Sequence, residues 1–306
     1  MKKYHIFVCL FSLWIFTSVH GQPTSKKIDV LIVDGFSNHD WEQTTFVVKT
    51  ILEKSELFNV SVSTSPAEPE DKNWKHWKPK FKKFDVVIIN CNNINNKEIK
   101  WPKKIEKHLE HYVSTGGGLY ILHSANNAFP HWKGYNLMIG LGWRQPNQGI
   151  ALQVTNDEKI KEIPLGEGKA TYHGPRNDVI IYKLNNHLIN RDLPKKWKTP
   201  DMELYKYARG PAKNLTVLSY AKDDITNINW PVEWVVSYGN GRVYNSSMGH
   251  LWKGQTYPMS YRCIGFQTIL IRATEWLASE SVTYKIPENF PTEFNISLVN
   301  EQISKK

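Results

Sequence analysis

Residues 116–125 read GGGLYILHSA. The glycines favour a turn, the four apolar residues after them favour a short buried strand, and His123 and Ser124 follow where that strand ends. In an open α/β sheet, ligands collect in the crevice beyond the carboxyl ends of the strands. The stretch therefore predicts a strand that delivers His123 to a binding edge. The competing interpretation is that His123 only caps the strand and bonds to a neighbouring loop.

The N-terminal half repeats this pattern of strand and helix. Residues 28–33 and 84–90 are apolar runs typical of buried parallel strands, and residues 60–62 form a shorter one. Segments with helical spacing, residues 41–57 and 98–114, lie between the runs. This alternation predicts an α/β fold with a doubly wound, mostly parallel sheet. Right-handed crossovers would place the loops after residues 33, 90 and 122 at one edge.

From residue 150 onward the pattern changes to a β-rich excursion. Short β-like runs occupy residues 151–155, 179–184 and 216–221. Two longer runs flank Asn240-Gly241, which is a strong hairpin signal. Residues 258–279 have the spacing of an amphipathic helix, and the tail at 281–306 has no assigned structure.

The first residues predict a signal peptide over residues 1–21. Lys2 and Lys3 precede an apolar run at 6–16, and cleavage is expected near Gly21-Gln22. The run is shorter than the roughly 20 residues that span a bilayer, so no stable membrane insertion is expected. The mature protein should be exported to the periplasm or secreted.

The composition indicates a basic protein of 306 residues with a formal net charge of +10. Lysine gathers at residues 72–83 and 195–198, which could favour anionic partners such as acidic oligosaccharides. A solvated basic surface is the default interpretation, and no nucleic-acid motif is present. Without the leader, two cysteines remain, Cys91 and Cys263. A disulfide between them and a pair of buried thiols both stay open.

Four further polar motifs follow predicted strands or lie near them. They contain His39, His173, Glu203 and His250. Imidazole titrates near neutral pH, so His and Glu together can act as general acid and base. The same groups can ligate a divalent metal, with His39, His123 and His250 as candidate ligands, although the chain has no HExxH motif. Each histidine taken singly is more often structural.

Aromatic residues accompany these motifs, at Trp41, Trp132, Trp143, Trp234 and Trp252. Flat aromatic faces suit stacking on sugar rings, although core packing is the commoner use of tryptophan. Trp41 and Trp234 are the candidates for stacking on a sugar ring.

Covalent nucleophiles are disfavoured. An esterase elbow around Ser124 would need glycine at 122 and 126, where the chain has Leu122 and Asn126. Cys91 has no partner histidine indicated by the sequence. The glycines at 116–118 precede their strand, so they are not a dinucleotide fingerprint.

In order along the chain, the motifs are NHDW at 38–41, the 116–125 stretch, ELY at 203–205, PVEW at 231–234, YGNGRVY at 238–244 and MGH at 248–250. In this order they resemble the ThuA-like, or trehalose-utilisation, family over about residues 28–277. The resemblance implies a flavodoxin-like fold related to class I glutamine amidotransferases, without their cysteine nucleophile. It also implies carbohydrate catabolism, often beside enzymes of keto-sugars. Met202 departs from the family's usual Asp-Glu pair, and His187-Leu188 from its usual His-Pro.

We therefore expect residues 22–280 to form one ThuA-like domain of an exported carbohydrate-catabolism protein, a hydrolase or lyase acting on a glycoside or an oxidised (keto) sugar. In this hypothesis His123 and Glu203 form the acid/base pair. The remaining candidates would contact the substrate, and the histidines among them could instead bind a divalent metal. These candidates are His39, Trp41, His173, Trp234 and His250. The alternative is a non-catalytic sugar-binding protein that uses the same crevice.

Overall fold

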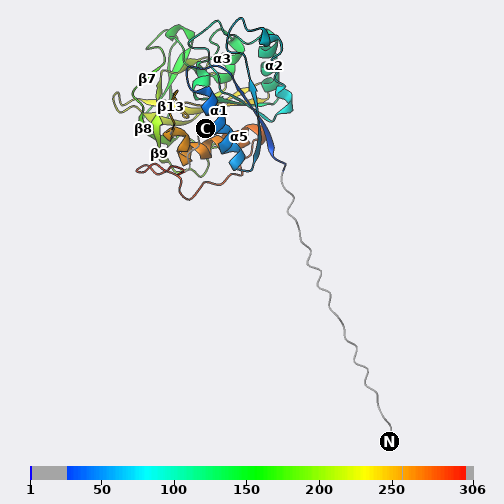
Figure 1. Cartoon of the computed structure of the whole chain (residues 1–306). Coiled ribbons are helices and arrows are strands. Elements are labelled where there is room, and N and C mark those ends of the chain that lie inside the picture. Colours follow the sequence, from blue (N-terminus) through cyan, green and yellow to red (C-terminus); the bar gives the residue numbers. More distant parts are fainter. Residues whose placement is uncertain (2–25, 257, 301–306) are drawn as a thin grey trace.

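The computed structural model describes residue 1 and residues 26–256 and 258–300, so the predicted signal peptide lies outside the described residues apart from its first residue. Helices cover both faces of a large central sheet (Figure 1). The strands are β1 (Ile28–Asp34), β2 (Phe58–Thr64), β3 (Val86–Ile89), β4 (Gly118–Leu122), β5 (Ile150–Val154), β6 (Ile160–Ile163), β7 (Tyr172–His173), β8 (Asn177–Lys183), β9 (Lys196–Met202), β10 (Tyr205–Lys206), β11 (Arg209–Gly210), β12 (Leu215–Lys222), β13 (Asn229–Tyr238) and β14 (Gly241–Ser246). The α-helices are α1 (Trp41–Lys54), α2 (Lys103–Ser114), α3 (Lys133–Ile139), α4 (Met259–Arg262) and α5 (Ile264–Ser279). The 3₁₀ turns are η1 (Lys72–Lys75), η2 (Phe81–Lys83), η3 (His123–Asn127) and η4 (Pro146–Gln148).

The first half of the sheet is parallel, in the order β2-β1-β3-β4-β14. Its central strands are buried on both faces because alternate side chains enter two separate cores. In β1, Val30 and Ile32 pack with α1 and α5, whereas Leu31 and Val33 pack with the side that carries α2 and α3. The predicted doubly wound, mostly parallel sheet is confirmed.

The second half continues the same sheet with antiparallel strands, in the order β14-β13-β12-β8-β9. The predicted hairpin is β13–β14, closed by Gly239 and Asn240. Strand β9 is not predicted from the sequence, because its lysines and Pro200 obscure the β pattern. Proline is tolerated there because β9 lies at the edge of the sheet.

The glycines at positions 116, 117 and 118 each have a different structural role. Gly116 has φ +118° at the end of α2, a conformation that other residues rarely adopt. A Cβ on Gly117 would overlap the ring of Tyr112, and one on Gly118 would lie 2.4 Å from the carbonyl oxygen of Leu277 in α5. The glycines therefore end a helix and let β4 pass directly against α5.

Two predicted helices have different bounds in the structure. The helix expected over 98–114 begins only at Lys103, because a proline disfavours the α conformation of the residue before it, here Trp101. The helix expected over 258–279 is broken at Cys263, whose backbone is extended.

The segment after α5 packs on the domain although no structure was assigned to it. The backbone N–H of Ile264 donates to the carbonyl oxygen of Ser297, and that of Val299 donates to Arg262, at 2.9 Å each. Phe290 is buried beside Trp197. The described part of the tail therefore belongs to the folded unit.

Cys91 and Cys263 are both free and buried in the described structure. A disulfide between them is therefore absent, and the pair of buried thiols is the correct alternative. None of the helices that the structure describes is long and apolar enough to cross a bilayer.

Candidate active site

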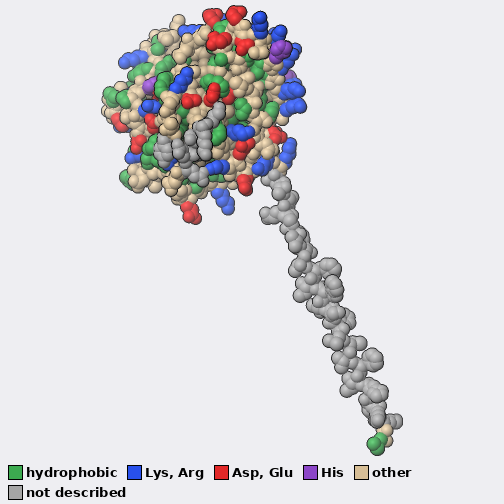
Figure 2. Space-filling view, viewed as in Figure 1, with side chains coloured by type: hydrophobic (Ala, Val, Ile, Leu, Met, Phe, Trp, Pro, Cys, Tyr) green, Lys and Arg blue, Asp and Glu red, His purple; other side chains and the backbone are tan. Residues whose placement is uncertain are grey.

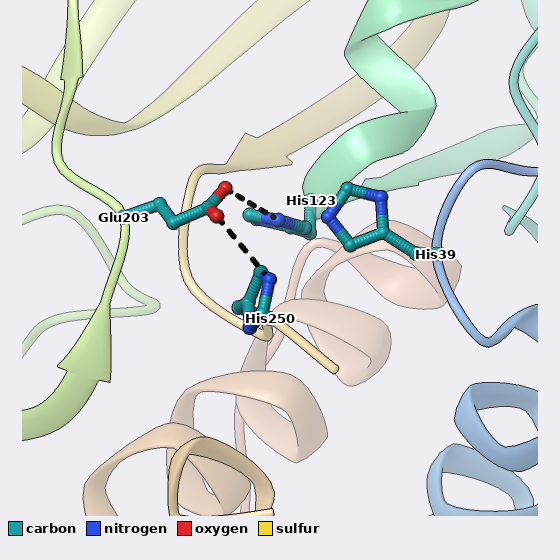
Figure 3. Close-up of side chains that lie close together, drawn as sticks. All are labelled: His39, His123, Glu203 and His250. Atoms are coloured by element: carbon teal, nitrogen blue, oxygen red, sulfur yellow. Dashed lines mark ion pairs between the residues drawn. The ribbon is translucent and has the colours of Figure 1, made fainter. Parts of the chain in front are cut away.

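Four buried side chains converge beyond the carboxyl end of the parallel sheet. His39 follows β1, His123 follows β4 and His250 follows β14, so three parallel strands deliver them to one edge. Glu203 arrives from the opposite side, directly after β9. One ligand-capable atom of each residue lies within 4.8 Å of those of the other three (Figure 3). The edge predicted to carry loops therefore holds a compact His₃–Glu cluster.

His123 occupies a strained turn between a strand and a 3₁₀ helix. Its φ is +42°, which is uncommon for a residue other than glycine and often marks a functional site. The ring is fixed because Nδ1 donates to the carbonyl oxygen of Ser247 at 2.8 Å. In the neutral ring Nε2 then carries a lone pair, and it lies 3.5 Å from Oε2 of Glu203.

The orientation of His39 follows from a chain of hydrogen bonds. The backbone N–H of Ile94 donates to Oδ1 of Asn92, so the amide group of Asn92 donates to Oδ1 of Asn38 at 3.0 Å. Oδ1 of Asn38 therefore accepts from Nδ1 of His39, also at 3.0 Å. Nε2 of His39 is left with a lone pair, and it is buried without a hydrogen-bond partner. Burial, followed by the charges of His123 and His250, lowers the pKa of His39 to about 2.

His250 has the opposite tautomer. Arg176 can only donate, and its guanidinium lies 3.0 Å from Nδ1 of His250. In the neutral ring Nε2 therefore carries the proton and donates to Oε1 of Glu203 at 3.2 Å. Burial is the largest cause that lowers the pKa of His250, to about 3. His250 orients Glu203 and has no free lone pair for a metal in this arrangement.

Glu203 is the anionic group of the cluster. Burial raises its pKa, but protonated His123, through a hydrogen bond and its charge, and the charges of protonated His250 and His173 lower it to about 2. His173 approaches from β7, with Nε2 3.5 Å from Oε1 of Glu203. Its Nδ1 donates to the carbonyl oxygen of Gly174 at 2.6 Å, which turns Nε2 toward the carboxylate.

The cluster has the donor set of a cation site. Nε2 of His123 and Oε2 of Glu203 are both electron-pair donors, and at 3.5 Å they repel each other unless a proton or a metal ion lies between them. The lone pair of His39 points to the same place and has no partner. Imidazole nitrogen and carboxylate oxygen suit zinc and similar divalent metals. The hydrogen bonds from His123 to Ser247 and from His39 to Asn38 are the outer contacts that metal-binding histidines normally make.

A cavity of about 370 Å³ opens onto the cluster. Its walls include His39, Glu203 and His250 from the cluster, whereas His123 does not line it. The remaining lining residues are Asn38, Trp143, His173, Arg176 and Trp252. Trp252 is 46% exposed and lies nearly parallel to the ring of His250. The cavity therefore combines the polar groups of the cluster with two aromatic side chains, Trp143 and Trp252.

The family model for trehalose utilisation, ThuA, matches residues 29–277. The chain belongs to the ThuA family. A ThuA-like protein from Parabacteroides merdae is 30% identical, covers 92% of this chain and 100% of its own, and superposes with a TM-score of 0.83. Comparison with the curated proteins gives no match. The family places this ThuA protein in carbohydrate metabolism.

Two other solved structures are less similar to this chain. The cytoplasmic protein STM3548 from Salmonella typhimurium is 15% identical, with a TM-score of 0.44 over 81% of the ThuA chain and 98% of its own. A glutamine amidotransferase from Thermotoga maritima is 7% identical, with a TM-score of 0.42 over 72% and 75% of the two chains.

The structure brings five of the predicted site residues together in this ThuA protein and leaves two outside. His39, His123, His173, Glu203 and His250 all meet at the cluster. Trp234 is fully buried, and its indole N–H donates to the carbonyl oxygen of Ile139, so it is a core residue and cannot stack on a substrate. Trp41 begins α1, is only partly exposed and does not line the cavity.

The sequence did not reveal the role of Arg176. It lies in an irregular segment before β8, and only the fold brings it to His250. Trp143 and Trp252 were noted as aromatic neighbours of the motifs, and these two, rather than Trp41 and Trp234, form the walls of the cavity.

The disfavoured nucleophiles remain poor candidates. Cys91 is buried, and burial raises the pKa of its thiol well above the usual value, which opposes thiolate formation. The hydroxyl of Ser124 accepts a hydrogen bond from Asn92 at 3.1 Å.

Proposed function

We propose that this protein is an exported, metal-assisted enzyme of sugar breakdown, a lyase acting on an oxidised (keto) sugar glycoside. His39, His123 and Glu203 would hold one divalent metal. The observation that carries the proposal is the convergence of two unprotonated ring nitrogens and a carboxylate on one point beside the cavity.

The composition of the cavity favours elimination over ordinary glycoside hydrolysis. Glycosidases commonly use two carboxyl groups on either side of the scissile bond. Among the described residues that line this cavity, Glu203 is the only carboxylate. A metal ion at the cluster would instead act as a Lewis acid on the carbonyl oxygen of a keto sugar, which acidifies the neighbouring C–H.

The proton transfers then fall to residues of the cavity wall. A base removes the proton from the carbon next to the carbonyl, and that electron pair forms a C=C bond. The glycosidic oxygen on the following carbon leaves with its bonding electrons and takes up the proton from the protonated base, which restores the base. His173 is suited to the first transfer because its Nε2 faces the cluster from the open side of the cavity. Arg176 and Asn38 are placed to orient hydroxyl groups.

Metal binding is measured first, on protein that begins at Gln22 and carries no histidine tag. Elemental analysis and calorimetry with Zn²⁺ or Mn²⁺ should give one metal per chain. His39→Ala, His123→Ala and Glu203→Gln should each weaken binding by about tenfold or more. His76→Ala is the matched control, because His76 is exposed and lies outside the cavity.

Turnover is measured on a 3-keto-glycoside and on its unoxidised parent. The keto sugar should release its alcohol and form a conjugated enone with an ultraviolet absorbance, and the parent should not react. Removing the metal should abolish turnover, and returning it should restore it. Full activity without metal would contradict the metal role and return His123 and Glu203 to the acid/base pair.

The non-catalytic sugar-binding protein is the second candidate, supported by the two tryptophans that line the cavity, Trp143 and Trp252. Calorimetry on the same sugars distinguishes a sugar-binding protein from an enzyme. Binding of both the keto sugar and its parent, with no product from either in the metal-loaded protein, would favour this alternative.

A further inference from the structure

A second hollow, of about 610 Å³, lies on the protein surface and shares no residue with the His–Glu cavity. It is formed by η1, η2, the segment between them and the outer side of α2. We refer to it as the basic groove, lined by Trp74, Lys75, Trp77, Lys78, Pro79, Lys80, Phe81, Lys82, Lys83, Pro102, Lys104, Ile105, His108 and His111. Hollows of this size hold small ligands or short polymer segments.

The floor of the basic groove is aromatic and held in place. The rings of Trp74 and Trp77 pack edge to face at 5.7 Å, and Trp77 packs in turn on the buried Trp101. The indole N–H of Trp74 donates to the carbonyl oxygen of Glu68, and that of Trp77 donates to the hydroxyl of Ser63. Trp74 is partly exposed, so a preformed aromatic surface meets solvent.

The rim of the basic groove carries one sign of charge. Six lysines and two histidines line it, and no Asp or Glu does. None of these lysines forms an ion pair with the described residues, whereas other surface lysines, such as Lys159 and Lys195, do. Figure 2 shows Lys, Arg and His side chains gathered on the edge of the molecule where Figure 1 has α2.

The carboxylates of α2 do not neutralise this rim. Glu106 is buried and pairs with Lys103 and His131, and Glu110 accepts the indole N–H of Trp132. Both are therefore engaged by other groups. Six lysines and no carboxylate line the basic groove, so its rim is positively charged over an aromatic floor.

We propose that the basic groove binds a segment of an anionic polysaccharide, one that carries uronate or sulfate groups, as an accessory site separate from the His–Glu cavity. Sugar rings stack on flat aromatic faces, and the lysine rim pairs with the acidic groups. Carbohydrate is the preferred occupant because the protein belongs to a family of carbohydrate metabolism. The site would hold the enzyme on an acidic glycan and does not depend on the reaction proposed above.

The test is calorimetry of the chain from Gln22 with a sulfated hexasaccharide, an oligogalacturonate and a neutral maltohexaose. The two acidic sugars should bind and the neutral one should not. Replacing Lys78, Lys82 and Lys104 together by Ser should weaken binding by about tenfold or more. The matched control replaces Lys161, Lys213 and Lys285, which are exposed elsewhere and remove the same charge. The control should change affinity less than about twofold.

Trp74→Ala provides a second measurement that leaves the charge unchanged. It should weaken binding of the acidic sugars by about tenfold, and Trp74→Phe should recover part of that affinity. Thermal unfolding establishes that each variant is folded. Equal losses in the two lysine variants, or full affinity in Trp74→Ala, would overturn the proposal. So would tighter binding of single-stranded DNA or of vesicles of acidic phospholipid than of either acidic sugar.

Discussion

At the scale of single residues, the site depends on which ring nitrogen carries a proton. His39 and His123 both donate through Nδ1 to fixed oxygens, so their Nε2 atoms face the centre as acceptors. His250 is reversed by Arg176 and donates to Glu203. Three histidines that look equivalent in the sequence therefore have two different roles. The motifs predicted which residues meet, but not these tautomers, because their partners lie in other loops.

Trp252→Ala is predicted to weaken sugar binding by about tenfold, because it removes one aromatic wall of the cavity. The effect should fall on KM or Kd and leave kcat nearly unchanged. Trp252 is exposed, so the melting temperature should not change. Trp41→Ala is the comparison, since Trp41 lies outside the cavity. Equal losses of affinity in the two variants would remove Trp252 from the substrate site.

At the scale of elements, β4 is positioned by how closely it approaches α5. Gly118 begins β4 where the backbone of Leu277 leaves no room for a Cβ. This contact joins residues far apart in the chain. The sequence predicted the turn and the strand from the glycines, but it could not reveal that α5 would pass this near.

Gly118→Ala is predicted to lower the free energy of unfolding by about 3 kcal/mol, the upper end for overpacking, because the clash is with backbone. Gly174→Ala is the control. Its Cβ would meet only the flexible end of Lys206 at 3.5 Å, so the expected change is within about 0.5 kcal/mol. Urea denaturation measures both. A change below about 1 kcal/mol in Gly118→Ala would mean that α5 shifts easily.

At the scale of the whole molecule, one buried carboxyl links the sheet to the pH dependence of stability. Glu233 is fully buried in β13 and accepts hydrogen bonds from Ser219, Tyr244 and Asn190. Burial raises its pKa, although these hydrogen bonds oppose the shift. The folded chain therefore keeps this proton to a higher pH than the unfolded chain. The contribution of Glu233 to the free energy of unfolding is therefore lost as the pH rises from near 4.5, the ordinary pKa of glutamate, through the raised pKa of the folded state.

Glu233→Gln is predicted to flatten that decline, because glutamine does not titrate. Between pH 5 and pH 8 the melting temperature of the native chain should fall relative to that of the variant, by about 2–4 °C for each kcal/mol involved. Calorimetric scans across this range measure the difference. A constant offset between the two proteins at every pH would show that Glu233 has the same pKa in both states.

Much of the architecture is already present in local pattern. Apolar runs such as 28–33 and 84–90 predict buried strands. Asn240-Gly241 between two β-prone runs predicts the hairpin, and the order of the motifs predicts the family. These features depend on residues that are neighbours in the sequence, so periodicity and turn chemistry are sufficient to predict them. The five polar site residues could be chosen because each belongs to a motif that was already visible.

Other features exist only once distant segments pack together. Trp234 lies in a site motif, yet alternation along β13 directs it into the core, and Arg176 reaches His250 across 74 residues. The basic groove likewise forms only where η2 meets α2. In each case the position of the side chain depends on a contact between segments that are far apart in the chain. The 116–125 stretch illustrates both cases. Its residues specify a turn, a strand and the histidine that follows the strand. Only the fold places the lone pair of His123 opposite Glu203.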